Sequence, residues 1–324
     1  MTDQLVSLSL VAVYSAMGVY TIAFIMFTLD FAKRSAKAQA PVAVEAEAGS
    51  ASAARGGTAV LDRVEVDAPR SAVSYRFERI AFALTILGWL IHVAATVMRG
   101  IAQGYVPWSN MFEFSLTATA IIVGVFIGIQ LWQNLRFLGA YITGFVVIAM
   151  GIGAVNFYVD VKPLPPALQS AWLVIHVFVA VLGTSFFALG AGLSIAQLLQ
   201  ARRAAAAGAG LRLLRTLPGA ATLENLAYRV NVVGFVFWTF TLIAGAIWAE
   251  RAWGRYWGWD TKEVWTFIIW TIFAGYIHAR ATRGWRGSRS AWLAIIGFGA
   301  VIFNFTIVNL FFEGLHSYSG LTPQ

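Results

Sequence analysis

The sequence predicts an all-α integral membrane protein with about eight spanning helices. It has 324 residues, of which 59% are hydrophobic and only 12% are charged, whereas soluble domains carry about 25% charged residues. Runs of about 20 apolar residues, each long enough to cross a bilayer, recur along almost the whole chain. A water-soluble fold cannot bury so many helices that are apolar on every side, so the bilayer is the expected solvent.

The expected spans follow one another through mostly short connections. They are Leu5–Leu29, Ile80–Met98, Met111–Trp132, Phe137–Phe157, Ala171–Leu198, Val230–Ala249, Val264–Ala279 and Ala291–Phe312. The connections 30–79 and 200–223 are rich in small residues, and we expect the first to be flexible and to build no core. The chain therefore divides into residues 1–79, with the first span and a cytoplasmic loop, and residues 80–324, a membrane domain.

The distribution of basic residues predicts the orientation. With both termini outside, eighteen of the 23 Lys and Arg residues fall in inner segments and five in outer ones. The positive-inside rule favours this arrangement over its inverse. We therefore expect a multi-pass protein of the plasma (inner) membrane, with four outer segments: Arg99–Asn110, Tyr158–Ser170, Glu250–Glu263 and the tail Glu313–Gln324.

Charge and cysteine content narrow the possible functions. The net charge of +8 lies mainly in loops beside the membrane, so membrane lipid rather than nucleic acid is the expected partner of these cations. The chain has no cysteine. It cannot bind an iron–sulfur cluster or use a thiol nucleophile, and any redox chemistry must come from a cofactor or a partner.

The segment Trp253–Asp260 is the strongest candidate for a binding site. It reads Trp-Gly-Arg-Tyr-Trp-Gly-Trp-Asp. We expect Trp257 and Trp259 to form a flat aromatic surface that suits a large planar ligand. Two nearby cations, Arg251 and Arg255, are candidates to meet carboxylates at the rim of that ligand. The alternative is an interfacial aromatic belt, because Trp and Tyr favour membrane interfaces in any case.

The four histidines all lie in or beside expected spans. His176 and His316 fall at the outer level, next to the aromatic segment, and neutral imidazole is a common axial ligand of haem iron. A planar macrocycle between these two rings accounts for both histidines and the tryptophans together. His278 lies roughly 20 Å deeper than Trp265 along a helix and is a candidate for a second, inner position. The alternative for each histidine is a packed, hydrogen-bonded residue, and the sequence assigns no role to His92.

Glu113, in the segment Pro107–Phe114, is expected to stabilise the first turn of a helix that Ser109 or Asn110 caps. An alternative role in orienting a ligand stays open.

Together these motifs resemble one family, the CcsA/ResC proteins of cytochrome c biogenesis system II, called CcsB in actinobacterial naming. The resemblance rests on the tryptophan-rich (WWD) motif with the following Lys-Glu-x-Trp, and on four shorter matches. It covers roughly Arg79 to Tyr318. The shorter matches are His-Val at His176, His-Ala-Arg at His278, Gly-Leu-His-Ser-Tyr at Gly314–Tyr318 and Pro-x-Ser-Asn-x-x-Glu at Pro107.

The resemblance implies transport of haem b, as substrate and transient ligand, and its presentation on the extracytoplasmic face. Two thiols of an apocytochrome c Cys-x-x-Cys-His motif then add to the haem vinyl groups, as in a holocytochrome c synthase (haem lyase). The resemblance also implies two kinds of partner protein: thiol-reducing proteins and a ResB-type membrane protein. The external histidine pair carries over to His176 and His316, and the intramembrane histidine to His278. The haem-contacting motif carries over to Trp253, Trp257, Trp259 and Asp260.

Three other functions remain open from the residues alone. A haem exporter or chaperone would deliver haem without forming the thioether. An electron-transfer subunit would hold permanent b haems between histidines on facing buried helices. A small-molecule transporter would need polar or broken spans near the midplane, of which the sequence has few.

Overall fold

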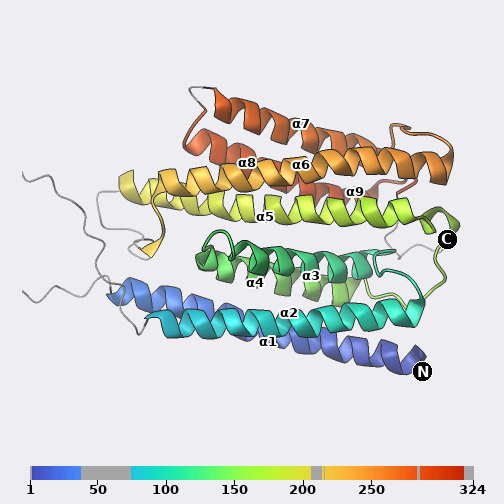
Figure 1. The fold of residues 1–324 in the computed structure, drawn as a ribbon, viewed down its shortest axis with the longest axis horizontal. Helices are drawn as coiled ribbons and strands as arrows, with labels where there is room; N and C mark the ends of the chain where they lie inside the picture. Colours follow the sequence, from blue (N-terminus) through green and yellow to red (C-terminus); the bar gives the residue numbers. More distant parts are fainter. Residues whose placement is uncertain (1, 38–73, 206–213, 215, 283–284, 317–324) are drawn as a thin grey trace, which may run out of the picture.

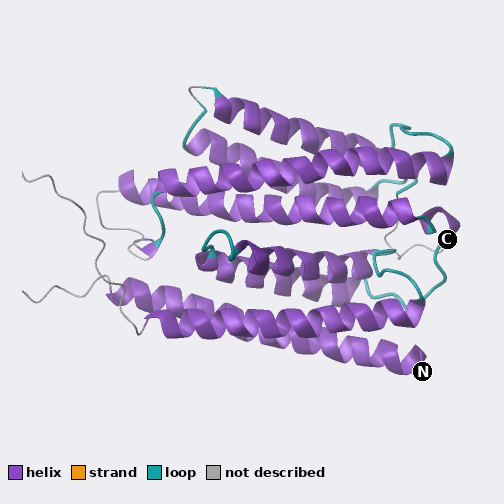
Figure 2. Ribbon diagram, in the orientation of Figure 1, coloured by secondary structure: helices purple, strands orange, loops and turns teal. Residues whose placement is uncertain are grey.

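The structure is a computed structural model, which describes residues 2–37, 74–205, 214, 216–282 and 285–316. Within these residues the regular structure is entirely helical, as predicted (Figure 2). The elements are α1 (Thr2–Lys37), α2 (Ser74–Gln103), α3 (Met111–Ile129), η1 (Arg136–Leu138), α4 (Gly139–Asn156), η2 (Pro166–Leu168), α5 (Ala171–Ala205), α6 (Ala220–Trp253), α7 (Thr261–Ala281), α8 (Ser288–Phe305) and α9 (Ile307–Phe311).

The helices confirm a polytopic membrane protein. In the described part of the chain, seven are long and apolar enough to cross a membrane. The eighth expected span, α7, has 21 residues but does not belong to these seven, since Trp, Thr, Tyr and His lower its hydropathy. Large apolar side chains also project outward: Val11, Val97 and Phe240 are each more than half exposed. An apolar exterior of this kind is stable in lipid.

The helices extend beyond the apolar runs that predicted them. The sixth begins at Ala220 rather than Val230, and the fifth ends at Ala205 rather than Leu198. Hydropathy locates the segment within the hydrocarbon, whereas backbone hydrogen bonding continues into polar residues outside it. The last span is interrupted at Thr306, between α8 and α9. The loop predicted to be flexible falls mostly at 38–73, outside the described residues.

The bundle has two groups of helices, α1–α4 and α5–α9 (Figure 1). One hydrophobic core lies around Phe126, Ile142 and Leu189, where α3, α4 and α5 meet. A second lies around Phe187 and Phe273, whose rings stack in parallel between α5 and α7. Small residues permit close helix contact: a Cβ at Gly183 of α5 would lie 3.2 Å from a backbone nitrogen of α6. Such contacts are typical of helix packing in membranes.

Five segments that are distant in sequence meet at one end of the bundle. They are the start of α1, the two connections after α2 and α4, the loop between α6 and α7, and the segment after α9 (Figure 1). This grouping is the one expected for the outer segments. Which side of the membrane this end faces remains a prediction from the distribution of basic residues.

Candidate functional site

A cavity of about 410 Å³ opens among the last four of these segments, and its volume is within the range of small-molecule sites. Its wall is mostly apolar and aromatic, and it comes from both groups of helices. Trp108 and Trp257 lie in the loops, and Trp248 and Trp238 lie along α6. These last two residues are ten positions apart, so the cavity extends about 15 Å along the helix. His176 and His316 both line it.

His176 is held in one tautomer by the neighbouring helix. Its Nδ1 lies 3.0 Å from the carbonyl oxygen of Thr241 on α6. A carbonyl oxygen can only accept, so Nδ1 carries the proton and Nε2 carries the lone pair. Trp248 lies nearly parallel to the imidazole, with ring centroids 5.8 Å apart. Gly245 gives the ring its space, because a Cβ there would lie 2.7 Å from Cε1 of His176.

His316 is held by a carboxylate instead of a carbonyl. Its Nδ1 lies 2.6 Å from Oδ2 of Asp260, and Gly314 leaves space for that carboxylate, which a Cβ would occupy. The imidazole edge meets Trp248 and Trp253 at centroid distances of 5.4 and 4.8 Å. The two histidines therefore share one tryptophan, Trp248, as a neighbour.

Asp260 serves two purposes at once. It is the N-cap of α7 and forms a capping box with Glu263, which satisfies free N–H groups of the first turn. Burial raises the pKa of Asp260, but the hydrogen bond and the charge of His316, with backbone N–H groups of Leu315 and Lys262, outweigh it, so the pKa is lowered. The carboxylate therefore stays ionised near neutral pH and accepts the Nδ1 proton of His316.

The tryptophans of the motif diverge from the single flat surface expected. Trp257 lines the cavity, but the ring of Trp259 is perpendicular to it and 76% exposed. Trp259 also has a positive φ of 60°, which turns the chain sharply before α7. Trp253, the last residue of α6, contacts His316 rather than the cavity. Arg251 and Arg255, the expected carboxylate partners, do not line the cavity either.

The other two histidines lie apart from this cavity. His278 is exposed on α7, near the opposite end of the bundle. His92 is fully buried on α2, with Nδ1 3.4 Å from the hydroxyl of Tyr20 on α1. The structure thus brings together His176, His316, Trp257 and Asp260, with Trp253 behind His316.

Sequence reasoning missed several residues of the cavity wall, among them Trp248 and Lys262. Trp248 is buried, and its Nε1 donates to the carbonyl oxygen of Ala167 at 3.1 Å. Its place inside an expected span gave no signal to distinguish it from a packing residue. Lys262 also lines the cavity. It belongs to the Lys-Glu-x-Trp segment, which placed it next to the tryptophan-rich motif but did not indicate a function for its side chain.

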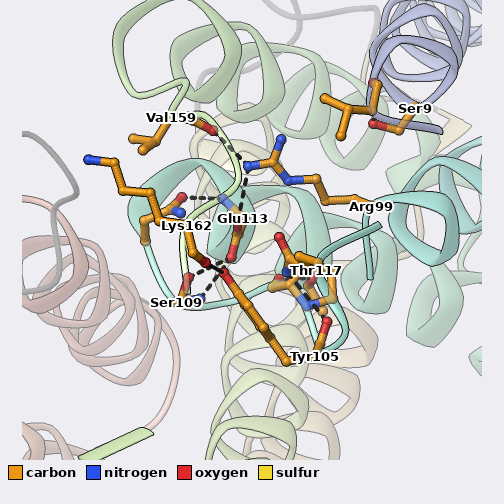
Figure 3. Close-up of polar contacts among 12 residues, drawn as sticks. Ser9, Arg99, Tyr105, Ser109, Glu113, Thr117, Val159 and Lys162 are labelled. Atoms are coloured by element: carbon orange, nitrogen blue, oxygen red, sulfur yellow. Dashed lines mark hydrogen bonds and ion pairs between the residues drawn. The ribbon is translucent and has the colours of Figure 1, made fainter. Parts of the chain in front are cut away.

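A buried ion pair shapes the loop that carries Trp108 (Figure 3). Arg99 donates to Oε1 of Glu113 at 3.1 Å and to the carbonyl oxygen of Val159 at 2.7 Å. Both charged side chains are almost fully buried. The other oxygen of Glu113 accepts from the backbone and the hydroxyl of Ser109. Glu113 therefore has a structural role, which agrees with its expected place in the first turn of α3.

Comparison with known proteins identifies the family. Residues 108–316 match the model of the cytochrome c assembly protein family. A cytochrome c biogenesis protein CcsA of Guillardia theta is 36% identical over 259 residues, covering 75% of this chain and 86% of that protein. A CcsA protein of Synechococcus sp. (strain CC9902) is 34% identical over 263 residues, covering 71% and 83%. This chain belongs to the CcsA family.

A solved structure shares the fold of this CcsA family member. The cytochrome c haem lyase CcmF matches with a TM-score of 0.61 at 16% identity, over 98% of this chain and 49% of that protein. The chain thus spans about half the length of that protein. The family match begins at Trp108 and ends at His316, both of which line the cavity. The matched segment therefore covers the whole cavity, while α1 and α2 precede it.

Proposed function

We propose that this protein binds haem b in the cavity, with His176 and His316 as axial ligands, and presents it for covalent attachment to apocytochrome c. Family membership establishes a part in cytochrome c assembly. One observation carries the finer proposal: both imidazoles line one aromatic cavity, and each engages its Nδ1 with an acceptor. This leaves both Nε2 atoms as iron ligands.

The aromatic wall of the cavity suits a planar macrocycle. Trp248 and Trp257 provide apolar faces for a planar ring, and Asp260 increases the basicity of His316 as a ligand. At the attachment step, each apocytochrome thiol adds across a haem vinyl group. The sulfur bonds to one vinyl carbon and the thiol hydrogen moves to the other, so this step needs no oxidant. The protein is then a subunit of a haem lyase rather than a resident haem protein.

The site end faces outward in this proposal, and a ResB-type partner completes the synthase. The excess of Lys and Arg in the inner segments supports this orientation. His278 is exposed on α7, which suits an inner haem position shared with a neighbouring protein. The chain lacks cysteine, so single cysteines at Ser319 and Ala206 report sidedness directly. An impermeant thiol reagent should label Ser319→Cys and not Ala206→Cys in intact cells, and the reverse result contradicts the orientation.

The histidine pair is tested by cytochrome c maturation in cells that produce His176→Ala, His316→Ala or both. Each single variant should lose most maturation, because the iron loses one axial ligand. Added imidazole should partly restore the single variants, since a free ligand can occupy the vacated position, and should restore the double variant less. Membrane-inserted protein must be equal in all strains. Normal maturation by the double variant would refute the proposal.

A further inference from the structure

One cation lies on the wall of the cavity. Lys262, in the first turn of α7, lines it together with His176, His316 and Trp257. Among the described residues that form this wall, no other side chain is a Lys or Arg. Burial lowers the pKa of Lys262 to about 7, and the carboxylate of Asp260 opposes this shift. A further anion at the cavity wall would favour the charged ammonium.

No carboxylate of the described residues pairs with this ammonium. It donates to a neutral oxygen, Oδ1 of Asn309, and the ion pairs of the described residues do not include Lys262. Asp260 holds His316. Glu263 directs Oε2 to the backbone N–H groups of Gly258 and Asp260. An ammonium has three donors, and within the part of the chain that the structure describes only the one to Asn309 is used.

The same wall has a polar atom without a partner. Asn304 of α8 is only 6% exposed, lines the cavity, and has a buried Oδ1 with no hydrogen bond within the described residues. That oxygen is an acceptor and calls for a donor, whereas the remaining N–H groups of Lys262 call for an acceptor such as a carboxylate. Lys262, Asn304 and Asn309 are thus polar side chains on a mostly apolar wall.

We propose that Lys262 binds a propionate carboxylate of the haem, with Asn309 holding the ammonium in place. This inference rests on the proposed function and deepens it. The two propionates of haem b lie on the edge opposite the two vinyl groups. Two axial histidines leave the macrocycle free to rotate about the iron, and an ion pair at one edge removes that freedom. Lys262 therefore directs the vinyl edge away from α7, which sets where the apocytochrome thiols must approach.

An anionic lipid head group offers the same chemistry to Lys262. The walls favour haem, because the ammonium shares the cavity with both histidines and with aromatic rings rather than lying at the membrane surface. The experiment must still separate the two ligands. Esterifying the propionates of the tetrapyrrole does this, since it removes their negative charge and leaves the ring and the iron unchanged.

The test is a titration of the purified full-length protein with iron protoporphyrin IX and with its dimethyl ester, followed by the Soret absorbance. The wild type should bind the free acid about 10- to 100-fold more tightly than the ester, the usual effect of a charge-assisted hydrogen bond. In Lys262→Met this preference should fall to near one, while the spectrum of the histidine-ligated iron is kept. Lys162→Met, at an exposed lysine of the same end, is the matched control and should keep the preference.

The outcomes separate the two proposals. An unchanged preference in Lys262→Met overturns the role of Lys262 and leaves haem binding intact. Failure of the wild type to bind either tetrapyrrole overturns the proposed function and this inference together. Equal affinity of the wild type for acid and ester, with loss of co-purified anionic phospholipid in Lys262→Met, would assign the lysine to a lipid head group and also overturn the inference. Because acid and ester are compared within one variant, partial unfolding cannot mimic the expected result.

Discussion

The two ends of the bundle treat their charges differently. At the end away from the cavity, Arg34 pairs with Asp30 and Glu78, and Arg136 lies 3.6 Å from Glu78. Arg280 pairs there with Glu224 at 3.0 Å. At the cavity end, Arg99 is paired with Glu113 and His316 with Asp260, whereas Lys262 and His176 contact the neutral oxygens of Asn309 and Thr241.

The difference separates charges that hold the fold from charges that serve a ligand. A cation balanced by acids of the same chain needs no further partner. A cation on a cavity wall with only a neutral neighbour still lacks a counter-charge, which an anionic ligand can supply. The comparison therefore predicts that substitutions at paired charges change stability, while substitutions at the cavity change haem binding.

The largest expected effect on stability is at Arg99. Replacing it with Met leaves the Glu113 carboxylate buried and frees the carbonyl of Val159, which should cost about 3–5 kcal/mol. Arg136→Met is the control at the other end. That ion pair is longer and its arginine is one-third exposed, so the loss should be about 1 kcal/mol or less. Thermal unfolding of both purified variants in detergent checks this, and equal losses would show that burial of an ion pair does not set its contribution to stability.

A smaller effect, on binding alone, is expected for Asp260→Asn. Asn is also a good N-cap, so α7 should remain intact and the melting temperature should change little. The charge that orients His316 is lost, and changes of this kind typically weaken metal binding by about 10- to 100-fold. Haem titration measures the effect, with the exposed Asp160→Asn as control. A large fall in melting temperature without a change in haem affinity would show that Asp260 is only a cap.

The smallest effect is expected for Gly245→Ala. The new methyl would press on Cε1 of His176, and displacing the ring should cost about 1 kcal/mol and alter the spectrum of bound haem. Gly275→Ala on α7 is the matched control, because no atom lies within 4 Å of its Cβ position. In a helix that exchange should be neutral or stabilise by about 0.5–1 kcal/mol. Identical haem spectra for the two variants would argue against a tightly fitted His176.

Sequence patterns predicted the spans well and the cavity in part. Hydropathy located every long helix, because the bilayer demands length and apolarity whatever the tertiary contacts are. The ends of α5 and α6 were missed, since no such demand applies beyond the hydrocarbon. His176 and His316 were predicted at one level because each lies near a span end. The Arg99–Glu113 pair depends on contacts between separate connections, and Trp248 on which face of α6 meets α5, and neither is encoded in local sequence.

The loop between α6 and α7 also constrains how this family can vary. Gly258 has no side chain, and the guanidinium of Arg255 fills the position that a Cβ would take. Nη1 of that arginine is buried there without a hydrogen bond within the described residues. Any residue larger than Gly at 258 must displace the guanidinium of Arg255. We therefore expect the two positions to vary together in evolution: relatives with a side chain at 258 should also lack the arginine at 255.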